Sequence, residues 1–184
     1  MSFSPRRGLS SQDRPNRLEV FGLQPPITPF LWFDTEAEDA ANFYTSVFPN
    51  SRIVAVTHYG DAGPRPAGMV MTVAFELNGQ RFTALNGGPE PKFNHAVSFV
   101  INCEDQDGVD GYWQLLSDGG QEVACGWLTD RFGLSWQVVP EGLIELITDA
   151  DPERAQRATE AMLSMTKLDT EAIRRAADGV TAAS

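Results

Sequence analysis

The sequence predicts an α+β fold in which two βαβββ modules form a curved mixed-sheet cup, followed by C-terminal helices. The order strand, helix, three strands occurs twice along the 184 residues. The helix of each copy carries apolar residues at positions i, i+3, i+4 and i+7. A single shift of 69 residues, from Ala40 to Val109, superimposes these helices. Such a repeat indicates that each copy is one supersecondary unit, which buries its sheet against the other copy.

The first module begins with a short apolar and aromatic run, Phe30–Phe33, which predicts a buried strand. Thr35 and Glu38 have the spacing of a capping box, so we expect a helix to start there. Pro49-Asn50 ends this helix. Its apolar face consists of Ala40, Phe43, Tyr44 and Val47.

Three strands are expected to complete the first module. Arg52–Tyr59 is rich in β-branched residues and precedes a loop rich in glycine and proline. Met69–Leu77 and Gln80–Leu85 flank Asn78-Gly79, a pair that strongly favours a two-residue hairpin turn. The module therefore ends on an antiparallel hairpin.

The second module repeats this order. The strand Ala96–Ile101 comes first, and the shift of 69 residues places Phe30 on Phe99 and Trp32 on Ile101. The apolar helix face is then Val109, Tyr112, Trp113 and Leu116. Three further strands are predicted at Glu122–Leu128, Leu134–Val139 and Leu143–Thr148. Carboxylates at the helix starts of both modules favour the helix dipole and are interpreted as capping groups: Glu36, Glu38, Asp39, Glu104, Asp105 and Asp107.

The chain divides into three parts. Residues 1–25 are rich in polar residues and proline, without an apolar period, and predict a flexible tail. Residues 26–150 form the two modules, at about 26–88 and 94–149. Residues 151–184 form a helical extension, which starts at Asp151-Pro152-Glu153 and has a second helix at Thr170–Ala177.

The composition excludes several function classes. The formal net charge of -11, from 25 acidic and 14 basic residues, disfavours binding to nucleic acid. No apolar run reaches the roughly 20 residues that cross a membrane. Cys103 and Cys125 are predicted to be buried free thiols, as in a reducing cytosol. We therefore expect a cytoplasmic protein that binds neither nucleic acid nor membrane.

Several segments resemble a known family, the PhnB-like branch of the vicinal-oxygen-chelate (VOC), or glyoxalase/bleomycin-resistance, superfamily. The resemblance covers residues 26 to 179 and is most specific at Cys125–Pro140. Members of this branch are labelled 3-demethylubiquinone-9 3-methyltransferases. The resemblance implies two modules per chain, a cup and a homodimer. The segments that carry it are Ile27–Asp34, Asn42–Tyr44, Phe48–Asn50, Leu85–Gly88, Cys125–Pro140 and Ala161–Lys167.

The resemblance also implies where metal ligands would lie. In metal-binding relatives, four strands supply His or Gln, Glu, His and Glu. These positions carry over to Thr28 or Pro29, to a residue near Ala84, to His95 and to Gln137. One imidazole and one neutral amide are too few donors for a divalent ion. We therefore predict neither a metal nor another cofactor.

A small-molecule ligand is the predicted partner besides the second chain. Aromatic residues on the strands, together with a few polar anchors, are expected to line the cup, although each residue taken singly is also compatible with core packing. The predicted binding residues are Phe30, Trp32, Tyr59, Asn86, His95, Ser98, Trp127, Trp136 and Gln137.

Three functions remain open at this point. The first is a metal-free small-molecule-binding cup, which acts as a sequestering or resistance-type protein or catalyses an unknown reaction. The second is a metal-dependent lyase, isomerase or dioxygenase of the glyoxalase type. The third is methyl transfer, although the sequence has no glycine-rich loop after a first strand of the kind that a Rossmann-type donor site needs.

Overall fold

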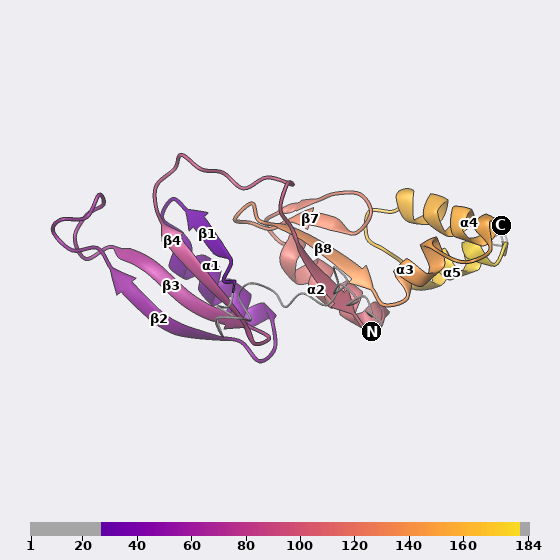
Figure 1. Cartoon of the computed structure of the whole chain (residues 1–184), viewed down its shortest axis with the longest axis horizontal. Coiled ribbons are helices and arrows are strands. Elements are labelled where there is room, and N and C mark those ends of the chain that lie inside the picture. Colours follow the sequence, from indigo (N-terminus) through magenta and orange to yellow (C-terminus); the bar gives the residue numbers. More distant parts are fainter. Residues whose placement is uncertain (1–26, 181–184) are drawn as a thin grey trace, which may run out of the picture.

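The computed structural model describes residues 27–180, so the predicted tail of residues 1–25 lies outside the described residues. The first module is a four-stranded sheet of order β1-β4-β3-β2, in which β1 is parallel to β4 and the other pairs are antiparallel. One helix packs on it (Figure 1). The elements are β1 (Phe30–Phe33), α1 (Ala37–Val47), β2 (Arg52–His58), β3 (Val70–Leu77) and β4 (Gln80–Asn86).

The second module has the same topology. Its sheet has the order β5-β8-β7-β6, and β5 is parallel to β8. The predicted pair of βαβββ modules with mixed sheets is therefore confirmed. The elements are β5 (Phe99–Cys103), α2 (Gln106–Ser117), β6 (Gln121–Glu122), β7 (Trp127–Thr129) and β8 (Ser135–Pro140).

Two predictions for the strands of the second module were wrong. The predicted strand Leu143–Thr148 is instead helix α3 (Leu143–Ile147), because Gly142 turns the chain out of the sheet at φ 79° and the apolar residues repeat at helical spacing. The predicted strand Glu122–Leu128 is divided into β6 and β7 by a turn. Cys125 and Gly126 both have positive φ in that turn, which interrupts an extended strand.

The repeat has different registers in the helices and in the strands. Helices α1 and α2 begin 69 residues apart, at Ala37 and Gln106, as predicted. On the first strands, however, the buried pair Leu31 and Phe33 corresponds to the buried pair Ile101 and Cys103, a shift of 70 residues. The predicted matches of Phe30 with Phe99 and of Trp32 with Ile101 are therefore one residue out. A slip of one residue exchanges the two faces of a strand.

The capping box predicted at Thr35 and Glu38 is not formed. The N-cap of α1 is Glu36, without a side-chain hydrogen bond. Asn86 at the end of β4 takes over this task, because its Oδ1 accepts from Ala37 N–H at 2.8 Å. The starts of α2, α4 (Pro152–Leu163) and α5 (Thr170–Ala177) carry the expected type of cap, and their capping side chains are Asp105, Asp151 and Asp169.

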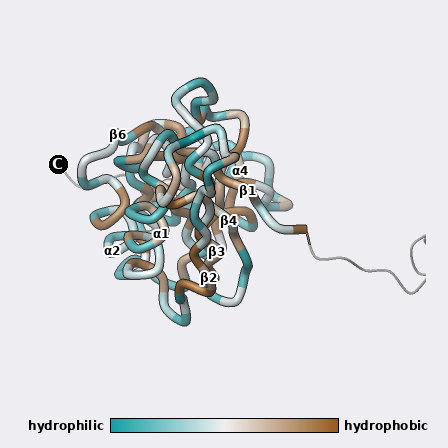
Figure 2. Tube along the Cα trace, turned by 90° about the vertical axis from the view of Figure 1, so that its left-hand side faces the viewer, coloured by the Kyte–Doolittle hydropathy of each residue, from teal (hydrophilic) through white to brown (hydrophobic). Residues whose placement is uncertain are grey.

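One apolar core spans both modules. Buried side chains of α1, β3 and β4 join those of α2, β7 and β8 in a single cluster. Aromatic pairs cross the boundary, with ring centroids 5.4 Å apart for Phe48 and Tyr112 and 5.6 Å apart for Tyr44 and Trp136. Hydrophobic segments recur along β2, β3 and β4 (Figure 2). The two modules are therefore one packed unit. No helix within residues 27–180 is long and apolar enough to cross a membrane.

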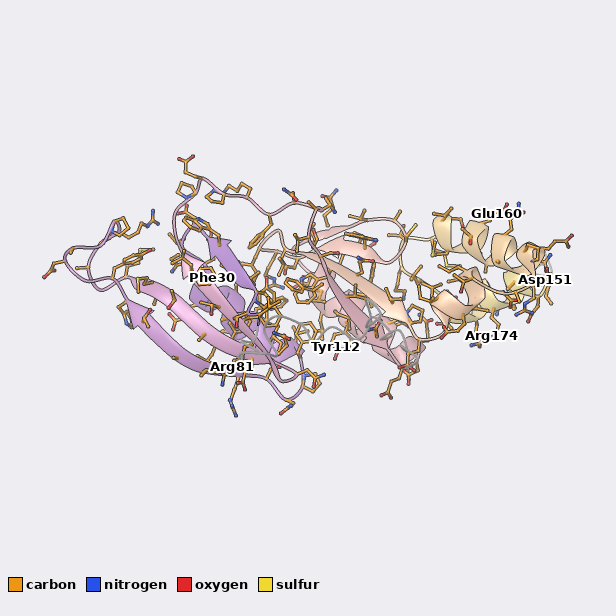
Figure 3. All side chains as sticks on the ribbon, in the orientation of Figure 1. Phe30, Arg81, Tyr112, Asp151, Glu160 and Arg174 are labelled. Carbon is orange, nitrogen blue, oxygen red and sulfur yellow. The ribbon has the colours of Figure 1, made fainter. Side chains whose placement is uncertain are left out.

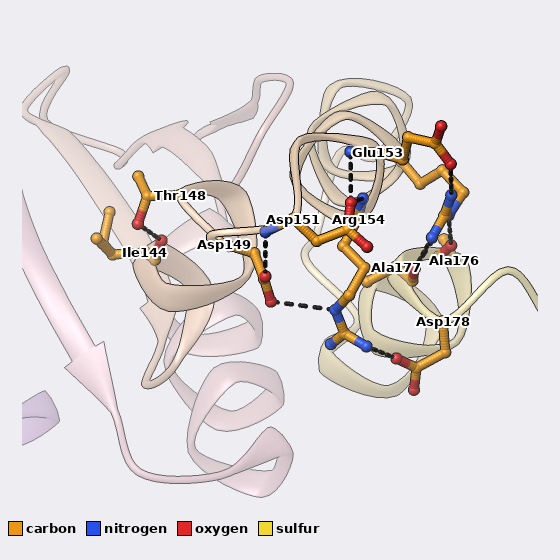
Figure 4. Close-up of polar contacts among 10 residues, drawn as sticks. Ile144, Thr148, Asp149, Asp151, Glu153, Arg154, Ala176, Ala177 and Asp178 are labelled. Carbon is orange, nitrogen blue, oxygen red and sulfur yellow. Dashed lines mark hydrogen bonds and ion pairs between the residues drawn. The ribbon is translucent and has the colours of Figure 1, made fainter.

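The C-terminal helices form a second, smaller core at the end of the molecule far from the first module (Figure 1). Arg154 joins the ends of this unit, since its Nε donates to Asp149 Oδ2 at 3.0 Å and its Nη1 pairs with Asp178 (Figure 4). Arg157 Nη2 donates to the carbonyl of Ala177 at 2.7 Å and so caps the end of α5. The predicted helical extension is present within the described residues.

The extension is attached to the second module by backbone hydrogen bonds. The N–H groups of Cys125 and Gly126 donate to the carbonyls of Met165 and Thr166, both at 2.8 Å. A Cβ at Gly126 would lie 2.9 Å from the side chain of Leu168, which is fully buried. The glycine in the Cys125–Pro140 motif therefore makes room for the chain that leads into α5.

Candidate functional site

Each sheet has one face under its helix and one face opposite, which we call the open face. In the first module the open face carries Phe30 and Trp32 of β1, in register with Thr83 and Leu85 of β4. Phe30 is 58% exposed and Trp32 is 36% exposed, and Figure 3 shows Phe30 on the outer strand β1. The alternation of β1 places Leu31 beneath the helix instead. Two predicted site residues thus share an accessible apolar surface.

The ring of Trp32 is fixed by the glycines that follow β4. Its Nε1 donates to the carbonyl of Gly88 at 2.8 Å. A Cβ at Gly87 would overlap the six-membered ring of Trp32. The Leu85–Gly88 motif therefore acts as a platform, because only glycine lets the indole lie directly on the backbone.

In the second module the open face carries four of the predicted residues. Gln137 of β8 lies in register with Val100 of β5 and Trp127 of β7. Gln137 Nε2 donates to Ser98 Oγ at 2.8 Å. The ring of the exposed His95 lies 6.2 Å from the ring of Trp127. These side chains form a surface of aromatic and polar groups.

Three predicted site residues lie in the interior instead. Asn86 is buried and joins α1 to β3, because its Nδ2 donates to the carbonyl of Val70 at 3.0 Å and its Oδ1 accepts from α1. Tyr59 is buried and donates to the carbonyl of Asn86 at 2.7 Å. Trp136 is buried on the face of β8 opposite to Gln137. The structure thus divides the nine predicted residues between the open faces and the core.

A buried carboxylate, Asp130, was not singled out from the sequence. It is 3% exposed, and its Oδ2 accepts from Tyr44 Oη and Trp136 Nε1, both at 2.8 Å. Its Oδ1 accepts from the backbone N–H groups of Phe132 and Leu134 at 2.9 and 3.0 Å. Burial raises the pKa of Asp130, while these hydrogen bonds act in the opposite direction. The signal available in the sequence was an Asp at the start of the turn ending in Gly133.

Two cavities of about 400 Å³ each lie at the boundary between the modules. One contains charged groups of both signs beside three aromatic rings, and the other lies between the β3–β4 hairpin and β5. The first is lined by Trp32, Asp34, Glu36, Pro91, Lys92, Phe93, Arg131, Phe132 and Gly133. The second includes Phe48, Phe82, Phe99, Val100, Tyr112 and Trp136.

The residues present do not fit the metal site of the metal-binding relatives. The position carried over to Ala84 is fully buried beneath α1, so a ligand there would point into the core. Its neighbours on the open face, Thr83 and Leu85, supply neither imidazole nor carboxylate. The amide of Gln137 already donates to Ser98. Within residues 27–180, no three His, Cys, Asp or Glu side chains are grouped so that they could hold a metal ion.

The repeated βαβββ topology places the protein among those with the VOC fold. Residues 25–139 match the model of the family described as 3-demethylubiquinone-9 3-methyltransferase, and the chain belongs to this family. This match ends before the C-terminal helices, so the resemblance at Ala161–Lys167 stays a prediction. No curated protein matches the sequence.

Solved structures support the same assignment. A putative 3-demethylubiquinone-9 3-methyltransferase, PhnB protein, from Bacillus cereus is 34% identical over 63% of this chain and 99% of its own, with a TM-score of 0.57. A protein from Pseudomonas aeruginosa is 22% identical over 64% of this chain and 98% of its own, with a TM-score of 0.54, which shows the fold alone. The fosfomycin resistance protein FosX from Mesorhizobium loti is 13% identical over 67% and 96%, with a TM-score of 0.49.

Proposed function

We propose that this protein binds a small molecule on the open faces of its two sheets, without a metal ion. The observation that carries this proposal is the exposure of Phe30 and Trp32 on β1, next to the backbone platform that orients the indole. Val100, 51% exposed, continues the apolar surface on the second sheet. Gln137 and Ser98 add polar anchors beside it. Apolar walls with a few oriented polar groups are typical of ligand sites.

We further propose that a second copy of the chain covers the open faces. Large apolar side chains seldom stay exposed together on a monomer, and two-fold assembly is the usual way for identical chains to bury such a surface. We expect the mass of a dimer by light scattering at tens of micromolar. Phe30→Asp should shift the mass towards the monomer, whereas Leu163→Asp, on the exposed side of α4, should not. A monomeric wild type contradicts the dimer.

Methyl transfer is a second candidate, because the family's description names it. The connection between β1 and α1 consists of Asp34, Thr35 and Glu36. It contains no glycine, and its two carboxylates stand where a Rossmann-type site places its glycine-rich loop. S-adenosylmethionine should therefore produce no heat in a calorimetric titration of the full chain. Stoichiometric binding would instead favour methyl transfer.

Native mass spectrometry of protein purified without chelator, combined with elemental analysis, tests the proposed function. We expect a co-purified small molecule and no stoichiometric metal. Trp32→Ala should lose the small molecule, while Leu115→Ala, on an exposed position of α2, should retain it. A stoichiometric metal ion that is lost in His95→Ala would contradict a metal-free site.

A further inference from the structure

Arg65 is presented by a closed loop between β2 and β3. Tyr59 N–H donates to the carbonyl of Met69 at 2.8 Å, and Gly68 N–H donates to the carbonyl of Tyr59 at 2.8 Å. These bonds join the two ends of the loop. A proline on each side of Arg65 restricts the backbone further. The loop therefore holds Arg65 in one region rather than leaving it on a free tip.

Only part of the Arg65 guanidinium has a partner. Its Nη2 donates to the carbonyl of Asp34 at 3.2 Å and to Asp34 Oδ1 at 3.0 Å. Its Nε is buried and has no hydrogen-bond partner among the described residues. A guanidinium has five N–H donors, and the side chain is 24% exposed. A buried donor without a partner indicates an acceptor that comes from outside the chain.

Arg65 and Trp32 approach each other at Gly88. Trp32 Nε1 donates to the carbonyl of Gly88, and Arg65 Nη1 lies 3.6 Å from the position that a Cβ on Gly88 would occupy. Gly88 has a φ of 112°, which disfavours any larger residue there. A cation thus lies at the border of the exposed indole on the open face.

We propose that Arg65 binds the oxyanion group of a small molecule whose apolar body lies against Trp32. This inference rests on the proposed function, because it assumes a ligand on the open face. The planar guanidinium matches the geometry of carboxylate and phosphate oxygens and stays charged at neutral pH. Asp34 competes with the ligand for the same guanidinium. The ligand class is therefore an aromatic or aliphatic acid or phosphate.

Benzoate and benzamide test this, because they share a ring and differ in charge. Calorimetric titration of the full chain at constant ionic strength should show benzoate binding about tenfold more tightly than benzamide. Arg65→Met should abolish that preference. Arg81→Met is the matched control, because Arg81 lies at the opposite end of β4 and pairs with Glu76 (Figure 3). It should leave the preference unchanged.

Asp34→Asn separates recognition from a structural role of Arg65. It removes the competing charge but keeps an acceptor, so benzoate affinity should rise while benzamide affinity stays constant. Arg65→Lys keeps the charge but loses the planar fork, and should show a smaller preference than the wild type even where Arg65→Met does not fold.

The outcomes distinguish the inference from the proposed function. Equal binding of benzoate and benzamide by the wild type, or wild-type benzoate affinity in Arg65→Met, overturns the role of Arg65. Binding of neither probe by the wild type overturns it as well. In each case Trp32→Ala addresses the open face separately, because loss of the co-purified molecule in that variant still supports the proposed function.

Discussion

The hydroxyl of Tyr44 donates a hydrogen bond of 2.8 Å to the carboxylate of Asp130, 86 residues further along the chain. Tyr44 belongs to α1 of the first module, and Asp130 follows β7 of the second. Burial is the main cause that raises the pKa of Tyr44, and the nearby Asp130 raises it further. The pair therefore joins the two modules by a polar contact inside an otherwise apolar core.

Tyr44→Phe should lower the free energy of unfolding by about 1–3 kcal/mol, because a buried carboxylate oxygen loses one of its two donors. Urea denaturation measures the change. Tyr112→Phe is the control, since the Tyr112 ring stacks on Phe48 and its hydroxyl lies outside this network. The control should change the stability by no more than about 0.5 kcal/mol. Equal effects of both substitutions would contradict a joining role for the Tyr44 hydroxyl.

Asp130 should make the stability depend on pH. Because burial raises its pKa in the folded state, the folded protein binds this proton more tightly than the unfolded chain does. The contribution of Asp130 is therefore fully present below pH of about 4 and is lost as the pH rises through the folded-state pKa. The difference in unfolding free energy between wild type and Asp130→Asn should shrink from pH 4 towards pH 7. A difference that grows with pH would show that the hydrogen bonds outweigh the burial.

Gly87→Ala should displace the Trp32 indole from its platform, because the new Cβ would overlap the ring. The indole N–H resonance of Trp32 should move or broaden in a nitrogen–proton NMR spectrum, as its hydrogen bond to Gly88 is lost. Gly60→Ala is the matched control, because open space surrounds that position. An unchanged Trp32 resonance in Gly87→Ala would mean that the ring does not rest on this glycine.

Leu168→Ala should detach the C-terminal extension, because Leu168 is fully buried and truncation of a buried leucine costs about 2–5 kcal/mol. Hydrogen exchange should increase in α4 and α5 and stay unchanged in α1. Leu163→Ala, on an exposed leucine of α4, should have no such effect. Uniformly faster exchange in both modules would instead show that the extension is part of the main core.

Local patterns sufficed for much of the fold. The helix faces of Tyr44 and Trp113 follow from a spacing that depends only on the geometry of a helix. The caps at Asp105 and Asp151 follow from the same kind of local chemistry. The strand Leu143–Thr148 was wrong because a short apolar run fits either a strand or a helix, and the left-handed Gly142 decided between them.

The sequence by itself determined the repeated βαβββ order and placed Phe30, Trp32 and Gln137 among the candidate binding residues. Only the tertiary structure decided which face of each strand is covered, and so moved Asn86 and Trp136 into the interior. Alternation along a strand specifies two faces but does not say which one meets a helix. That choice depends on contacts between residues far apart in the chain, as when the Asp130 carboxylate meets α1.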